Sequence, residues 1–96
     1  MSERRLPSEL AKVVKAIKNQ LSAEVDVERV PMDDPWPDQF RLAVVSRKFR
    51  SLSPFKRQDL VWEIVNRILS PGQALAISVI LTFSPAELEP ASRSKK

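Results

Sequence analysis

The chain has 96 residues, 43% of them hydrophobic, which is enough for one domain with a single core. It contains neither cysteine nor histidine, which excludes disulfides, thiolate metal sites and the commonest general acid–base. The longest apolar run, residues 74–83, is about half the length that crosses a bilayer, and the charged N-terminus is unlike a signal peptide. We therefore expect a cytoplasmic protein without a cofactor that is not an enzyme and does not enter a membrane.

The net charge of +4 hides a strong local asymmetry. Residues 23–40 hold six acids and one arginine, a net −5, whereas residues 41–57 hold six basic residues and no acid, a net +6. Charge polarity of this kind bears on partners rather than on the fold. Five of the basic residues are candidate contacts for a partner or a phosphate: Arg47, Lys48, Arg50, Lys56 and Arg57. The alternative is a solvated loop that the acidic segment balances.

The N-terminal half predicts a helix followed by two strands. Apolar residues at helical spacing over residues 10–21 indicate an amphipathic helix. Residues 23–30 then alternate apolar and acidic side chains, which is typical of a strand with one wet, acidic face. Pro31 ends this strand. The Pro- and Asp-rich residues 32–39 predict a hairpin loop, and residues 40–46 a second, antiparallel strand. Trp36 in the loop is either a lid over the core edge, which we favour, or an exposed anchor for a partner.

The C-terminal half predicts a helix, a strand and a final helical turn. Ser53 followed by Pro54 is typical of a helix start, and an apolar stripe continues to about residue 69. Residues 73–83 favour a strand that is buried on both faces and therefore central, followed by a helical turn over residues 84–89.

The resulting order is α-β-β-α-β(-α), an α+β fold in which a three-stranded mixed sheet carries both helices on one face. This order corresponds to the type II KH-like arrangement. We expect residues 1–7 to form an N-terminal arm, residues 8–89 the domain, and residues 90–96 a flexible, basic tail.

Residues 44–62 resemble the BolA family. They contain a hydrophobic strand end, Ser46, Phe49 and a short loop, and then Arg57-Gln58 three to four residues before Val61-Trp62. BolA proteins typically show the same succession, with an Arg-His pair before a Val/Ile-aromatic pair. Residues 73–77, together with residues 82–87, are similar to the family's His-Ala-Leu strand and its Thr-Pro-x-Glu ending.

The resemblance spans roughly residues 8–89 and implies a non-enzymatic regulatory or adaptor protein. BolA proteins with monothiol glutaredoxin partners use histidines to help ligate a shared [2Fe–2S] cluster. The positions that resemble those histidines are Gln58 and Gln73 here, and a glutamine amide is a poor iron ligand. We therefore expect contact with a glutaredoxin-like protein without the familiar ligand.

Two alternatives stay open. The family also includes DNA-binding regulators, and the basic residues at a helix N-terminus could bind DNA or RNA phosphates. Phe49 and Phe55 could then stack on bases, although packing under the loop is the favoured role. KH-type recognition is not expected, because the single glycine, Gly72, cannot supply a GXXG loop. An enzyme built on carboxylates would need a buried acid pair with shifted pKa values, and the acids here fall on predicted wet faces.

Overall fold

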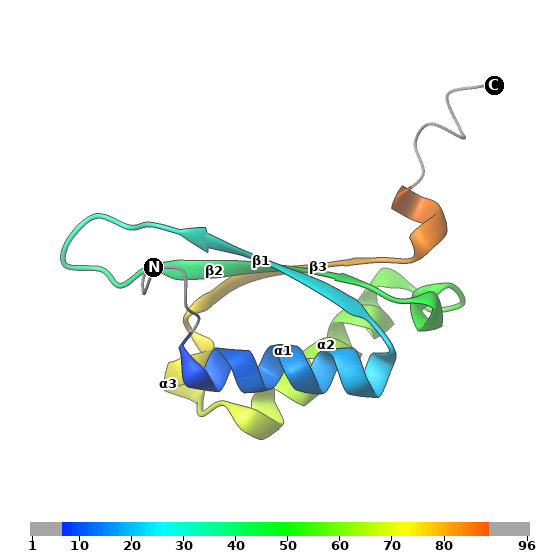
Figure 1. Cartoon of the computed structure of the whole chain (residues 1–96), viewed down its shortest axis with the longest axis horizontal. Coiled ribbons are helices and arrows are strands. Elements are labelled where there is room, and N and C mark those ends of the chain that lie inside the picture. Colours follow the sequence, from blue (N-terminus) through cyan, green and yellow to red (C-terminus); the bar gives the residue numbers. More distant parts are fainter. Residues whose placement is uncertain (1–6, 89–96) are drawn as a thin grey trace.

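A computed structural model describes residues 7–88 and shows one sheet with helices on one side. The main elements are α1 (Ser8–Leu21), β1 (Glu24–Val30), β2 (Gln39–Val45), α2 (Pro54–Ile68) and β3 (Ile77–Phe83), and the short ones are η2 (Arg47–Phe49), α3 (Pro71–Ala74) and η3 (Pro85–Leu88). The strand order is β1-β2-β3, with β1 antiparallel and β3 parallel to the central β2. Figure 1 shows α1 and α2 on the same face of the sheet. The predicted α+β fold is confirmed.

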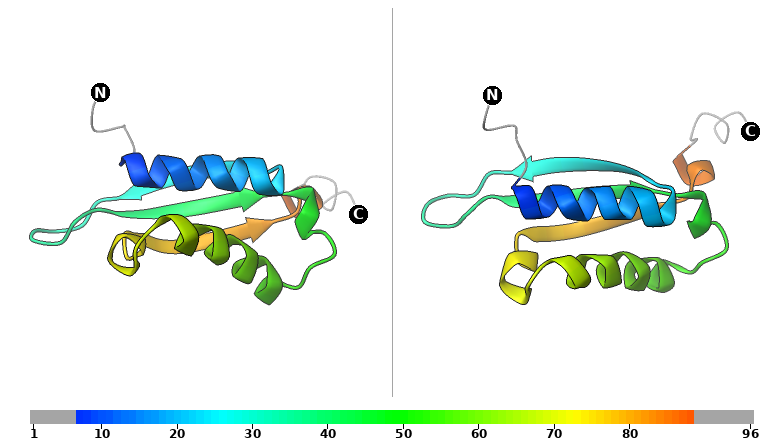
Figure 2. Two further views of the ribbon diagram at one scale, coloured as in Figure 1. Left: turned by 90° about the horizontal axis from the view of Figure 1, so that it is seen from below. Right: turned by 60° about the horizontal axis from the view of Figure 1, so that its bottom comes forward.

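The core lies between that sheet face and the two long helices. α1 lies along β1 and α2 along β3, as the views from the helix side show (Figure 2). β2 runs between them, so its inward side chains are covered by both helices. The side chains that are completely buried here are those of Val13, Ile17, Leu42, Val44, Phe49, Val61 and Val65. Each such side chain contributes about 1.5–3 kcal/mol through removal of apolar surface from water.

The last strand differs from the prediction in two respects. It begins at Ile77 rather than at residue 73, because Pro71–Ala74 forms the short helix α3. It is also an edge strand rather than a central one, since the crossover through α2 places it beside β2 with no further strand beyond it. Val79 and Leu81 consequently point to the uncovered face and are 39% and 41% exposed. The prediction of a central strand buried on both faces is therefore wrong.

The opposite, uncovered face of the sheet carries the predicted acidic row. Glu24, Asp26 and Glu28 are exposed along β1, at positions that alternate with inward-facing valines. The alternation expected for a half-buried strand is confirmed.

The predicted arm over residues 1–7 (apart from Pro7), residue 89 of the domain, and the predicted tail over residues 90–96 lie outside the described residues. No helix among residues 7–88 combines the length and apolar character needed to cross a membrane.

Candidate functional site: the two ends of the sheet

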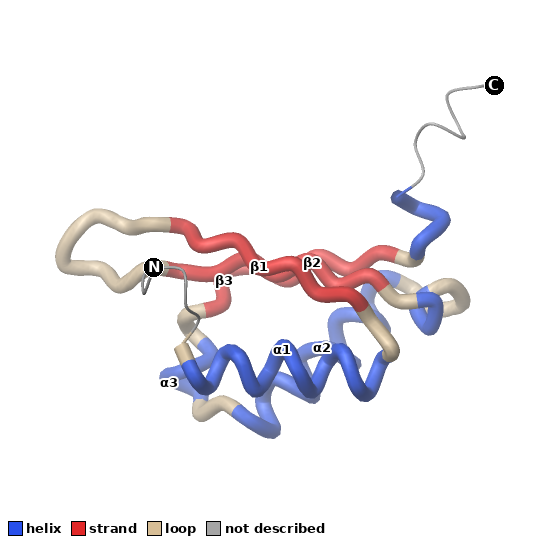
Figure 3. The backbone as a smooth tube through the Cα atoms, in the orientation of Figure 1, coloured by secondary structure: helices blue, strands red, loops and turns tan. Residues whose placement is uncertain are grey.

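Two surfaces at opposite ends of the sheet contain the predicted site residues. Figure 3 shows the long loop between β1 and β2 at one end, and the loop from η2 to α2 at the other. We call the first the hairpin end, defined by residues 31–38 and α3. The second is the basic end, defined by residues 46–57 and η3.

At the basic end, Ser46 fixes where the loop leaves the sheet. Its buried Oγ donates a hydrogen bond to the Leu21 carbonyl at 2.6 Å and accepts one from the Lys48 backbone N–H at 3.1 Å. One side chain thus joins the end of α1 to the start of η2. The following Ser53 accepts from the Lys56 N–H at 3.2 Å and caps α2, which confirms the predicted helix start.

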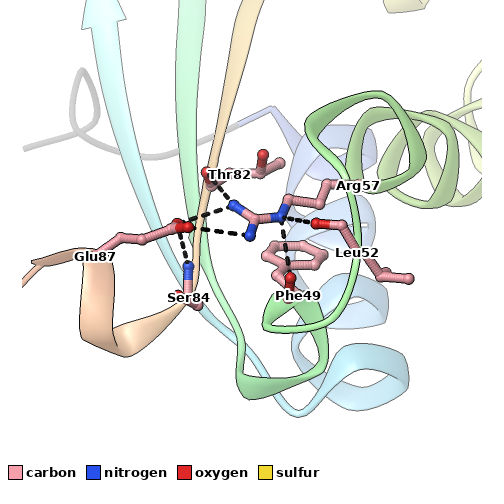
Figure 4. Close-up of polar contacts among 6 residues, drawn as sticks. All are labelled: Phe49, Leu52, Arg57, Thr82, Ser84 and Glu87. Atoms are coloured by element: carbon pink, nitrogen blue, oxygen red, sulfur yellow. Dashed lines mark hydrogen bonds and ion pairs between the residues drawn. The ribbon is translucent and has the colours of Figure 1, made fainter.

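Arg57 is buried beneath this loop rather than displayed on it. Its side chain is only 9% exposed. Nε donates to the backbone carbonyls of Phe49 and Leu52 at 3.1 and 3.0 Å, and the guanidinium lies 5.7 Å from the Phe49 ring centroid (Figure 4). Arg57 therefore holds the loop in shape, and its guanidinium faces the interior instead of an external phosphate.

Glu87 of η3 supplies the counter-charge. Arg57 Nη1 and Nη2 donate to its two carboxylate oxygens at 2.9 and 3.1 Å, and the Ser84 backbone N–H donates to Oε1 at 2.9 Å. The hydrogen bond from Arg57 and that from Ser84 lower the pKa of Glu87 from 4.5 to about 2. The pair joins η3 to the first turn of α2. No pattern in the sequence indicates that these two distant residues meet.

The remaining four predicted cations are exposed. Arg47, Lys48, Arg50 and Lys56 form no ion pair with any residue in the described range 7–88. Arg47 and Arg50 line an open pocket of about 250 Å³ together with residues 84–86, and Arg47 and Lys48 line the neighbouring one. The basic end therefore presents a genuine cationic surface, built by four residues rather than five.

The two phenylalanines of this region behave differently. Phe49 is completely buried, as the packing interpretation predicted. Phe55 is 72% exposed on the first turn of α2, so the packing interpretation is wrong for that residue. Phe55 follows Pro54, which occupies the first position of the helix.

The two glutamines that resemble family histidines in the sequence lie in different elements, Gln58 in α2 and Gln73 in α3. Gln58 is half-buried against β3, where Nε2 donates to the Ile80 carbonyl at 2.8 Å and Oε1 accepts from Trp62 Nε1 at 3.1 Å. Gln73 is exposed in α3, where its Oε1 accepts from the Ser70 N–H at 2.9 Å in a capping box. Both amides thus have structural hydrogen bonds of their own.

These residues do not fit an iron–sulfur cluster. The chain has no histidine or cysteine, and both glutamine oxygens already accept hydrogen bonds. Within residues 7–88 no three carboxylates gather as a metal site would require. Iron prefers thiolate and imidazole ligands in such clusters, so this chain offers no suitable donor set.

The hairpin end exposes large apolar side chains that the sequence interpretation did not combine. Trp36 is 66% exposed, so the expected lid over the core edge is wrong. Met32 is 43% and Leu75 is 74% exposed at the same end. The loop that carries Trp36 is braced by Asp38, which forms an ion pair with Arg29 at 3.2 Å. The sequence feature that places Trp36 on a loop is its two proline neighbours, Pro35 and Pro37, because proline is disfavoured within a strand.

A small apolar pocket lies close to this surface. It has a volume of about 220 Å³ and opens between the start of α1, β3 and α3. Its lining includes Leu10, Phe40, Leu69, Ile77 and Gln73. The position that resembles a family ligand therefore borders an apolar hollow.

Comparison with known proteins gives structural but not sequence matches. No protein-family model and no curated protein matches the chain. Mouse BolA1 in solution is similar, with 26% identity, a TM-score of 0.72, and coverage of 91% of this chain and 73% of that one. The BolA domain of Arabidopsis thaliana SufE1 is 26% identical with a TM-score of 0.66, over 86% of this chain and 99% of that domain. Arabidopsis BolA1 is 22% identical with a TM-score of 0.67, over 85% and 98%.

The fold, the element order and these neighbours agree. The chain has a BolA-like fold, with the α+β architecture and mixed sheet of the BolA structures.

Proposed function

We propose that this chain is a non-enzymatic adaptor that binds a protein partner, of the glutaredoxin kind, through its hairpin end. The observation that carries the proposal is the exposure of Trp36 and Leu75 at the hairpin end, where Gln73 of α3 also lines the apolar pocket. Exposed large apolar side chains of this sort mark binding surfaces, and tryptophan is enriched among residues that dominate binding energy. Gln73, the position similar to a family cluster ligand, lies at the same end.

The contact works without a metal ligand from this chain. The side-chain oxygen of Gln73 already accepts a hydrogen bond in the α3 capping box. The affinity for the partner therefore comes from apolar burial rather than from metal coordination. Binding is consequently independent of whether the partner carries a cluster. The occurrence of a BolA domain within SufE1 supports a role as a docking module. A regulatory role and a cytoplasmic location belong to the same proposal.

The test is calorimetric titration with a purified monothiol glutaredoxin, once cluster-free and once cluster-loaded. We expect similar affinity for both forms, and a loss of about tenfold or more in a Trp36→Ala/Leu75→Lys variant, because a central apolar anchor is worth 2 kcal/mol or more. Phe55→Lys is the matched control, since Phe55 is equally exposed but lies at the basic end. If neither the cluster-free nor the cluster-loaded form binds, glutaredoxin is not the partner. If affinity falls only in the Phe55→Lys control, the contact lies at the basic end instead.

A second candidate function is nucleic-acid binding at the basic end. Four exposed cations without ion pairs within residues 7–88 support it. The test is titration of labelled DNA and RNA oligonucleotides at two salt concentrations with wild type and a Lys48→Glu/Arg50→Glu variant. Phosphate binding predicts a log–log salt slope of roughly 0.7–0.9 per contact and loss of binding in the variant. Equal binding by both proteins would rule this function out.

A further inference from the structure

The uncovered face of the sheet is organised as a grid with charge on one side and apolar side chains on the other. Pairing between the strands aligns three rows across it: Glu24–Val45–Phe83, Asp26–Ala43–Leu81 and Glu28–Arg41–Val79. The β1 column is acidic, the β3 column is apolar, and the smallest side chain, that of Ala43, lies at the centre. Figure 1 shows that no described helix covers this face along its length.

One end of the grid is hollowed. A groove of about 370 Å³ is lined by Glu24, Asp26, Val45, Phe83 and Leu88, the last of which comes from η3. Leu81 and Leu88 remain 41% and 46% exposed. The groove therefore combines an apolar floor with a carboxylate wall.

Among residues 7–88 the two acids that line the groove form no ion pair, although Glu24 also lines the neighbouring pocket together with Arg47 and Lys48. Glu28 forms an exposed ion pair with Arg41 at 3.2 Å, but Glu24 and Asp26 form none with a residue of the range 7–88. Neighbouring strands lie about 4.8 Å apart, so the acidic column runs roughly 10 Å from the apolar one. A helix placed over β2 would present one flank to each column, because its side chains radiate around a cylinder about 10 Å wide.

We propose that this face docks a cationic amphipathic helix of a partner protein, with its apolar stripe on β3 and its Lys/Arg stripe on β1. Charge complementarity selects this occupant over a second copy of the chain. Two copies packed face to face would set the acidic column against another acidic column or against the apolar one, and both arrangements are unfavourable. The surface does not include the hairpin end and shares only Leu88 of η3 with the basic end. It therefore does not rest on the proposed function.

The probe is a labelled synthetic peptide that repeats leucine and lysine at helical spacing. Seven-residue strands span about 23 Å, which about 15 helical residues match. A second peptide carries glutamate in place of every lysine. We expect the lysine peptide to bind at least about tenfold more tightly by fluorescence anisotropy. In ¹H–¹⁵N spectra the largest shifts should fall on Ala43, Leu81 and Phe83.

Two matched pairs of variants locate the site. Glu24→Lys/Asp26→Lys should weaken the peptide about tenfold, whereas Asp33→Lys/Asp34→Lys, with the same change in net charge, should change it less than about twofold. Leu81→Asp should weaken binding, whereas Leu75→Asp at the hairpin end should not. Equal losses within a pair, shifts elsewhere, or no binding would overturn the proposal. A dimer by analytical ultracentrifugation with this face as its interface would overturn it in favour of self-association.

Discussion

The two ends of the sheet differ in which kind of side chain they bury and which they expose. At the basic end a cation is taken inside, where Arg57 ties two loop carbonyls and Glu87 together. At the hairpin end apolar groups are left outside, where Trp36 and Leu75 face solvent. The first arrangement stabilises the fold, and the second leaves apolar surface that no residue of the range 7–88 buries. A site therefore cannot be assigned from residue type alone, because availability depends on what each side chain already binds.

The largest expected effect on the free energy of unfolding comes from removal of the buried Arg57 guanidinium. Arg57→Ala removes the donor that the Phe49 and Leu52 carbonyls and both carboxylate oxygens of Glu87 share. We expect the free energy of unfolding to fall by about 3 kcal/mol, measured by urea denaturation with circular dichroism. Arg50→Ala, a nearby exposed cation, should change it by no more than about 0.5 kcal/mol. Similar losses in the two variants would contradict the distinction between buried and displayed cations.

Removal of the Glu87 carboxylate should have a smaller effect on the free energy of unfolding, and this effect should depend on pH. The pKa of Glu87 is lowered in the folded state, so its stabilising contribution is present above the ordinary value of 4.5 and is lost as the pH falls toward about 2. Glu87→Gln should be less stable than wild type at pH 7 and should lack this part of the acid-dependent slope. Urea midpoints between pH 7 and pH 2 measure both. Glu63→Gln, which alters an exposed pair with Arg67, serves as the control.

The two glutamines allow a finer comparison. Gln58→Met keeps the side-chain length but leaves the Ile80 carbonyl and the Trp62 indole N–H without their partner in a half-buried place. We expect a loss of about 1–2 kcal/mol in the free energy of unfolding, measured by the same denaturation. An unchanged midpoint would show that water replaces the amide there.

The smallest effect should come from Gln73. Gln73→Met removes one exposed hydrogen bond of the α3 capping box, which water can replace. The expected loss is about 0.5 kcal/mol. If Gln73→Met lowered the free energy of unfolding more than Gln58→Met did, the hydrogen bonds at the hairpin end would contribute more to stability. That result would contradict the contrast between the two ends.

Local patterns predicted most of the architecture. The helical spacing before residue 21, the alternation in β1, and the Ser53-Pro54 start of α2 each correspond to what the structure shows. The order of β3 in the sheet could not be read the same way, because hydrophobicity does not say how many strands will flank a segment. Leu81 is exposed because both long helices cover the opposite face of the sheet.

The site depended on contacts between distant segments and was accordingly harder to predict. The sequence does not distinguish Arg57 from the exposed basic residues near it. A run of charged residues does not show which of them will be buried when the chain folds. Its partner, Glu87, was assigned only to a family-like ending. Trp36 could be placed on a loop, but whether a loop folds back over the core depends on tertiary packing that no short pattern encodes.

The Arg57–Glu87 pair also sets an order of events during synthesis. The two residues are 30 positions apart, and a ribosome adds about 5–20 residues per second, so Arg57 is made roughly 1.5 to 6 seconds before its counter-ion. During that interval the loop around Arg57 holds a cation that has no carboxylate to neutralise it, and we expect it to remain open to proteases on ribosomes stalled before Glu87. Because Glu87 follows β3 in the chain, the contact that closes the basic end can form only after β3 has been made.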